Sequence, residues 1–338
     1  MINKKIIFYF SWLLISLLIL LIVIITSLCI GSSGILLKDI INVLFTKRVG
    51  TIEHSIIFDI RVPRIILGFA VGSSLSISGV ILQGIFRNPL VEPYTLGISG
   101  GAAFAICLNI LLGLNKENML LSIPISGFLG SILVLLIIYL LSTRKGILKI
   151  NQLLLTGVMI SFIASSLIMF IMSISRLEDL HQIIHWTMGS LEEPNLLLIK
   201  IIFFISLLGY FVSYFFSVEL NTFLLGEEEA IHLGINVNRV KKILFVLASL
   251  LTGSAVSVAG IIGFVGLVIP HLVRIIVGND HRILIICSGI IGAAFLILSD
   301  TIARTIIAPV ELPVGVITGI IGGSTFIYFL YKRNLYKK

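Results

Sequence analysis

Charged residues are scarce in this chain. Only 12% of its 338 residues are Asp, Glu, Lys or Arg, about half the share of an average soluble domain. Hydrophobic residues make up 58%, and the mean hydropathy is +1.16. This composition excludes a soluble globular protein. With about 20 apolar residues per crossing, the chain has room for about ten membrane-spanning helices and no sizeable domain outside the membrane. We therefore predict an all-α, polytopic fold in one transmembrane domain, residues 1–338.

Motifs for catalysis, nucleotide binding and metal binding are also lacking. The chain has no Gly-Lys dipeptide, and hence no Walker-type phosphate loop, and it has no His-Glu-x-x-His pair. Its three cysteines, Cys29, Cys107 and Cys287, lie far apart in apolar runs and show no metal-ligand spacing. The sequence shows no basic groove with interleaved aromatic residues, so it gives no indication of nucleic-acid binding. We expect a non-enzyme with no metal and no cofactor of its own.

Ten long apolar runs follow one another along the sequence. The first follows Lys4 and Lys5 but is too long for a signal-peptide core, so we expect it to be retained as a helix. Glycines and Pro270 interrupt the stretch 242–277, which we divide at a tight return near Gly260. The predicted spans are 6–30, 64–86, 95–114, 119–142, 151–174, 196–217, 242–258, 261–277, 283–303 and 313–331.

The distribution of positive charge predicts the orientation in the membrane. Ten spans place both termini on one side, and of the 24 Lys and Arg residues fifteen fall on that side and nine on the other. By the positive-inside rule, both termini are cytoplasmic. The arginines on the outer side then need an explanation of their own.

One acid stands well inside a predicted span. Asp300 lies four residues, or about one helical turn, before Arg304, so we expect a structural ion pair between them. A secondary transporter driven by an ion gradient is the competing class of function. Such proteins place several ionisable groups near the membrane midplane, and a single acid beside an arginine makes a poor relay.

Four segments carry more specific information than the spans. They are Arg61-Val62-Pro63-Arg64 with the later run Gln83 to Gly97, the acidic segment Gly226 to Gly234, the glycine-rich run Gly260 to Arg274, and Ser299 to Arg304 continuing into Glu311 to Gly315. In this order and at these separations, they resemble the permease family of ABC importers for iron–siderophore, haem and cobalamin. The resemblance extends from about residue 57 to residue 331.

The resemblance implies a type II ABC importer permease in the cytoplasmic membrane of a bacterium. Such a permease works as a homo- or heterodimer, with two cytoplasmic subunits that bind ATP and Mg and an extracytoplasmic binding protein that delivers the substrate. The substrate class it implies first is an iron chelate such as a siderophore, with haem or cobalamin as the alternative. Membrane lipid surrounds the assembly.

The resemblance also assigns roles to individual residues. Within a cytoplasmic coupling segment at about 219–241, the positions that match the family's ATPase-docking helix are Gly226, Glu227, Ala230, Leu233 and Gly234. A short acidic helix between glycines also has a simpler interpretation, a solvated loop.

Arg61, Arg64 and Arg304 match the outer arginines through which the family meets glutamates of the binding protein. The chemistry agrees, because the guanidinium group binds carboxylates bidentately and stays charged. The alternative is that these arginines anchor the helix ends to lipid headgroups.

A pathway for a large ligand needs small and hydroxyl side chains. The fifth and tenth spans meet that requirement and flank the central pathway in the family, which points to Ser161, Ser165, Thr318 and Gly319. His181 and His185 fall on an expected short outer helix, where haem ligation by either is a further alternative.

Overall fold

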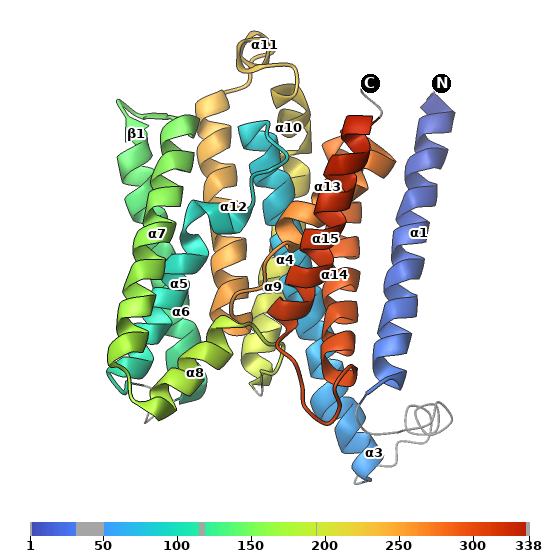
Figure 1. The fold of residues 1–338 in the computed structure, drawn as a ribbon. Helices are drawn as coiled ribbons and strands as arrows, with labels where there is room; N and C mark the ends of the chain where they lie inside the picture. The colour runs from blue at the N-terminus through green and yellow to red at the C-terminus, as the bar shows by residue number, and fades with distance from the viewer. Residues whose placement is uncertain (1, 32–50, 115–118, 194, 336–338) are drawn as a thin grey trace.

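The computed structural model describes residues 2–31, 51–114, 119–193 and 195–335, and these residues form a bundle of helices (Figure 1). Seven helical stretches are long and apolar enough to cross a membrane, and three shorter apolar helices accompany them. The long stretches are α1 (Ile2–Cys29), α3–η1–α4 (Ile52–Ser55, Ile56–Arg61 and Val62–Phe86), α6 (Met119–Ser142), α7 (Ile150–Ile174), α9 (Leu196–Phe215), α12 (Val237–Ala259) and α14 (His281–Thr305). The shorter ones are α5 (Ile98–Leu111), α13 (Val265–Val277) and α15 (Val314–Leu335). Together they occupy the ten predicted positions.

Short elements connect the apolar helices. Two lie between apolar helices near one end of the bundle: α10 (Ser217–Phe223) and α11 (Glu227–His232). At the same end, β1 (Thr143–Arg144) and β2 (Ile147–Leu148) pair antiparallel and join α6 to α7. At the opposite end lies α8 (Leu177–Thr187), the short helix expected there, and the 3₁₀ turn η2 (Pro93–Leu96) precedes α5.

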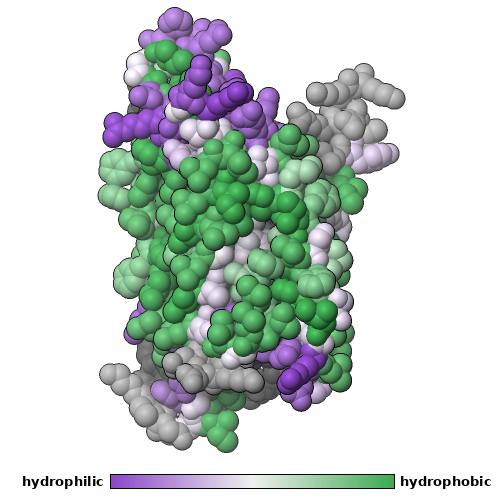
Figure 2. All heavy atoms as spheres, turned by 90° about the vertical axis from the view of Figure 1, so that its left-hand side faces the viewer, coloured by the Kyte–Doolittle hydropathy of each residue, from purple (hydrophilic) through white to green (hydrophobic). Residues whose placement is uncertain are grey.

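The two ends of the bundle are named here after α11 and α8. Helix α1 begins and α15 finishes at the α11 end, as an even number of crossings requires (Figure 1). Figure 2 shows a broad belt of hydrophobic residues between polar residues at the two ends. That belt matches a chain whose middle faces lipid tails and whose ends face water.

Helix α4 forms the centre of the bundle, because small residues let its neighbours approach closely. It packs against α14, α12, α9 and α13. A Cβ atom at Gly72 would collide with the carbonyl of Gly292, and one at Gly79 would collide with that of Gly266. Helices α1 and α7 lie at the periphery and expose most of their side chains.

Two predicted spans differ from the helices that the structure has. The span predicted at 261–277 begins its helix only at Val265, because Gly260 and Phe264 adopt left-handed backbone angles and the intervening residues are irregular. The span predicted at 64–86 starts earlier, since η1 and α3 continue the helix back to Ile52. Pro63 lies where the π-helical turn η1 passes into α4, a point at which the regular bonding to the fourth preceding carbonyl is already interrupted.

Candidate functional sites

A buried charged cluster lies at the α8 end, where α4 begins and α14 finishes. Its centre is Arg64, whose Nη2 lies 2.8 Å from Glu311 Oε2 and 3.0 Å from Glu192 Oε1. Arg64 Nη1 lies 4.0 Å from Asp300 Oδ1. One guanidinium group therefore joins α4 to α14 and to the connections that precede α9 and α15.

The predicted neighbours Asp300 and Arg304 lie within this cluster. Arg304 Nε is 2.9 Å from Asp300 Oδ2, across one helical turn. Arg304 Nη2 also donates a hydrogen bond to Ser27 Oγ at 3.2 Å, which connects α14 to the end of α1. Arg61 donates to the backbone carbonyl of Leu28. Arg64 and Arg304 are thus paired with carboxylates of the chain itself, as buried charges must be.

Because the three arginines are buried, they do not form a simple docking surface. Arg61, Arg64 and Arg304 are only 2%, 6% and 5% exposed. The accessible members of the cluster are Glu192 and Glu311, whereas its third acid, Asp300, is buried. A partner's carboxylate that bound Arg64 would therefore compete with Glu192 and Glu311 of this chain. The sequence interpretation had assigned neither of these two residues to the site.

The short helix α11 stands at the opposite end, between the two glycines that the sequence indicated. Gly226 has φ = +129° and Gly234 has φ = +85°, and nothing lies within 4 Å of a Cβ atom built on either. Glycine is needed here for its backbone angles, because L side chains rarely adopt them. The glycines set the angle at which α11 leaves α10 and returns to α12.

One side of α11 is fixed to the bundle. Ala230 is fully buried, and Glu227 Oε2 lies 2.6 Å from Lys241 Nζ on α12. Glu227 Oε1 also lies 3.6 Å from Nη2 of Arg87, the residue that ends α4. Two of the five residues assigned to coupling, Glu227 and Ala230, thus hold α11 in place.

The other side of α11 is exposed and mixed, with the acids Glu228 and Glu229 beside large apolar side chains. Ile231 and Leu233 are 60% and 64% exposed, and Leu224 and Leu225 before the helix are exposed as well. Large apolar side chains that gather at the polar end of a membrane protein indicate an interaction surface. A groove runs beside Ile231, between α11, the start of α12 and the strand residues Ile147 and Leu148.

A hydrogen-bonded network links α10 to neighbouring helices close to α11. Asn221 on α10 donates to Asp280 Oδ1 at 2.8 Å and accepts from the backbone amide of His281 at 2.7 Å. Tyr9 of α1 donates to the other oxygen of Asp280 at 3.1 Å. Burial by itself would raise the pKa of Asp280, but these hydrogen bonds, the Arg282 amide and the Arg282 charge lower it.

The four predicted pathway residues do not share one environment. On α7, Ser161 points inward and donates to the Gly157 carbonyl at 3.0 Å, whereas Ser165 is exposed. On α15, Thr318 is fully buried and donates to the Gly315 carbonyl at 3.1 Å. Open space surrounds Gly319, since nothing lies within 4 Å of a Cβ atom built there. Ser165 and Gly319 are therefore the two that border free space in this chain.

Irregular backbone inside the bundle is stabilised by side chains that the sequence interpretation missed. The carboxylate of Glu92, just before η2, accepts a hydrogen bond from the backbone of Phe264 at the start of α13. The Tyr94 hydroxyl accepts from the amide of Ile262 at 2.8 Å. Unpaired backbone groups are costly at membrane depth, so these bonds allow the break before α13 to exist.

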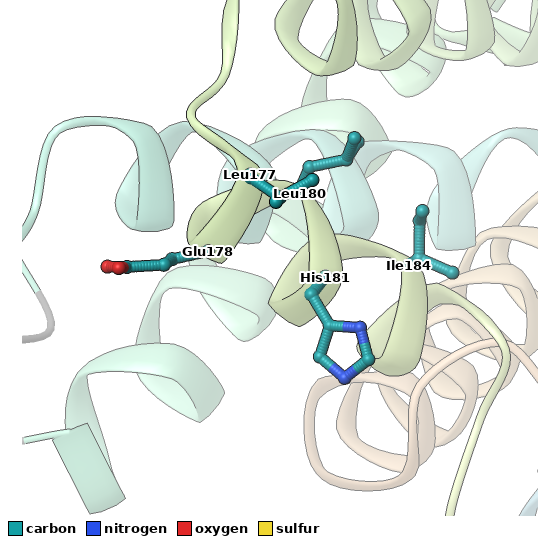
Figure 3. Close-up of a pocket in the computed structure, with 5 residues that line it drawn as sticks. All are labelled: Leu177, Glu178, Leu180, His181 and Ile184. Carbon is teal, nitrogen blue, oxygen red and sulfur yellow. The ribbon is translucent and has the colours of Figure 1, made fainter.

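A shallow hollow borders α8 at the other end. Its lining residues lie at helical spacing on α8 and are Leu177, Glu178, Leu180, His181 and Ile184 (Figure 3). No group of three or more His, Cys, Asp or Glu that could hold a metal ion occurs in the part of the chain that the structure describes.

In the part of the chain that the structure describes, ten apolar helices, with irregular backbone before α13 inside the bundle, form the architecture of a polytopic membrane protein. Residues 19–332 match the model of the FecCD transport family, and the chain belongs to that family. It is 38% identical to the hemin transport system permease protein HmuU of Yersinia pestis over 82% of this chain and 83% of that protein. It is 34% identical to the molybdate import system permease protein MolB of Haemophilus influenzae over 93% and 94%.

A solved structure shares this architecture. It shows an inward-facing conformation of a metal-chelate type ABC transporter and covers 96% of this chain and 99% of its own, with a TM-score of 0.83 and 33% identity. The predicted fold, a polytopic type II ABC importer permease, is thus confirmed, and the protein is a multi-pass transport component of the cytoplasmic membrane.

Proposed function

We propose that this chain is the permease subunit of an ATP-driven importer that carries an iron chelate into the cell. The observation that supports the proposal best is α11, a helix that is fixed to the bundle and exposes the apolar residues Ile231 and Leu233. An ATP-driven permease without a phosphate-binding loop needs a separate ATPase. Exposed apolar residues on a short helix offer that ATPase a contact surface. The partners proposed are a second permease, two ATP-binding subunits that carry ATP and Mg, and an extracytoplasmic binding protein.

The orientation follows from the same helix. If α11 meets the ATPase, the α11 end is cytoplasmic, and both termini lie on that side (Figure 1). The Lys and Arg distribution predicts the same orientation independently. The α8 end, with its charged cluster, then faces the binding protein.

Delivery of substrate is proposed to use Arg61, Arg64 and Arg304 through exchange of partners. The binding protein's carboxylates would replace Glu192 and Glu311 on Arg64, and Asp300 would keep Arg304 in place. Exchange of one carboxylate for another costs little, because the guanidinium group remains charged and paired throughout.

Haem and cobalamin are the alternative cargoes. Relatives include a hemin permease, a cobalamin import permease of Halobacterium salinarum and siderophore permeases of Bacillus subtilis. The molybdate relative widens the range further. Transport driven by an ion gradient is disfavoured, because Asp300 is already paired with Arg304.

Affinity purification of the full chain from its own membranes, with mass spectrometry of the chains that accompany it, tests the assembly. We expect an ATPase and a solute receptor among them. Reconstituted vesicles are then offered a radioiron-loaded hydroxamate siderophore, haem and labelled cobalamin, with and without ATP. ATP-dependent uptake of the siderophore supports the proposal; uptake without any ATPase would overturn it, and uptake of haem or cobalamin alone would change its cargo.

A further inference from the structure

The β1–β2 hairpin between α6 and α7 is fixed to the first turns of α12. The amide of Leu148 donates a hydrogen bond to Asn238 Oδ1 at 3.0 Å, and Asn238 Nδ2 donates to the Gly146 carbonyl at 2.7 Å. One side-chain amide thus binds the hairpin backbone twice, as a neighbouring strand would. Leu148 itself is buried.

Lys242 holds the same hairpin from the next turn of α12. Its Nζ donates to the Gly146 carbonyl at 2.7 Å and lies 5.9 Å from the centre of the Tyr139 ring on α6. Asn238 and Lys242 are four residues apart, so they project from one face of the helix. Both converge on Gly146, which adopts a left-handed backbone angle, φ = +77°.

The same two turns of α12 also hold α11. Lys241 lies next to Lys242, and its Nζ is 2.6 Å from Glu227 Oε2. The first turns of α12 therefore contact both the hairpin and α11. The groove between them is lined by residues of all three elements, including Ile147, Ile231 and Val237.

The hairpin is well placed to move α7. Helix α7 begins at Ile150, directly after β2, and most of its surface is exposed in this chain. It packs against α5, α6 and η2 but not extensively against α12, so the hairpin supplies its tie to the coupling end. A helix with few buried contacts is displaced by movement at its end more readily than a buried helix.

We propose that Asn238 and Lys242 form a clamp that transmits the movement of α11 through the hairpin to α6 and α7. The inference rests on the proposed function, since it requires that an ATPase drives α11. Asn238 and Lys242 are positioning residues here: neither needs to touch ATP, the ATPase or the cargo. Movement of α7 would change access to Ser165, which borders open space.

The test measures that access in the complete importer. The three native cysteines are replaced, Ser165→Cys is introduced, and the rate of maleimide labelling is compared without nucleotide and with ATP and vanadate. We expect the nucleotide-dependent change in rate to shrink about 2- to 30-fold in Asn238→Ala, the range typical of mutations along a coupling network. ATP hydrolysis should continue, which a general loss of folding would not allow.

Matched variants separate the clamp from mere loss of charge or fold. Lys242→Ala should act like Asn238→Ala and Lys242→Arg should retain the response, because it keeps the donor to Gly146. Arg239→Ala removes an exposed cation from the same turn and should behave like the parent. If Asn238→Ala does not fold, Asn238→Asp serves instead, since it keeps the acceptor for Leu148 and loses only the donor.

Two outcomes overturn the inference: a folded Asn238→Ala importer with the full parental response, or an equal loss in Arg239→Ala. Leu233→Asp, measured alongside, distinguishes the two proposals. If it abolishes the response while Asn238→Ala does not, the clamp alone is wrong. If it leaves the response intact, α11 is not the coupling helix and the proposed function fails at that site.

Discussion

The two ends of the bundle handle their interaction residues in opposite ways. At the α8 end Arg61, Arg64 and Arg304 are buried, and each is paired with a carboxylate, hydroxyl or carbonyl of the chain itself. At the α11 end, Ile231 and Leu233 are exposed, and the charged pair Glu227–Lys241 lies beneath them. The first end thus buries its arginines in pairs within the chain, whereas the second places exposed apolar side chains on an anchored helix.

This difference separates two kinds of contact. A partner at the α11 end gains the burial of apolar surface at once, because no residue of the chain has to leave. In the proposed assembly, a partner at the α8 end would have to exchange its carboxylates for those already present, so we expect its binding to be weak and reversible. The α8 end would therefore suit a receptor that has to release after each delivery. The α11 end would suit an ATPase that stays attached.

The largest effect is expected from Asp300→Asn at the α8 end. The change keeps the shape but leaves Arg304 without its carboxylate and Arg64 with one fewer. Breaking a buried ion pair from one side costs about 3–5 kcal/mol. We expect poor yield and a clearly lower unfolding temperature in detergent, measured by fluorescence-detected chromatography after heating.

Asp59→Asn is the control, because Asp59 is an exposed aspartate at the same end. It should melt like the parent. An Asp300→Asn protein as stable as Asp59→Asn would show that the cluster does not depend on this charge, and the contrast between the two ends would be lost.

The second effect concerns the α11 end. Leu233→Asp replaces an exposed apolar side chain with a charge and should lower stimulation of ATP hydrolysis by the loaded binding protein about tenfold or more, as expected for a central contact. Membrane insertion and unfolding temperature should not change, since Leu233 packs against little in this chain. Leu233→Met is the matched control; normal stimulation in Leu233→Asp would contradict the docking role of α11.

The third effect tests exchange of partners at Arg64. Charge reversal of Arg61 or Arg64 would damage the fold, because both are buried. Glu192→Gln with Glu311→Gln instead removes the competitors, and the binding protein should bind about 2- to 5-fold more tightly, as exposed ion pairs contribute about 0.2–1 kcal/mol. Surface plasmon resonance at low and high salt measures it; an unchanged or weaker affinity would indicate that Arg64 has only a structural role.

The smallest effect involves Asp280, the capping acid of α14 at the α11 end. Its pKa lies below the usual aspartate value, so it stabilises the fold above that value and loses this contribution as the pH falls through the folded pKa. Asp280→Asn should therefore lower the unfolding temperature at about pH 6, and the difference from the parent should shrink below about pH 4. A difference that is constant with pH would mean that the charge contributes nothing.

Local patterns predicted the helices well and the partners of side chains poorly. The glycines at 226 and 234 mark α11 because their backbone angles are a local requirement, and the spacing of Asp300 and Arg304 places them one turn apart. Glu192, Glu311 and Asn238 gave no such signal. Their partners lie many residues away, 90 in the case of Asn238 and Leu148, so only the packed bundle brings them together.

The sequence by itself determined the membrane class, the ten apolar helices, the family and the short helix between Gly226 and Gly234, because hydropathy, helical spacing and glycine backbone angles act over a few residues. The tertiary structure decided which charges are buried, where α13 begins and that the α6–α7 hairpin is fixed to α12. These depend on which side chains from distant segments share one low-dielectric interior, where a charge or a backbone amide must find a partner wherever the chain supplies one.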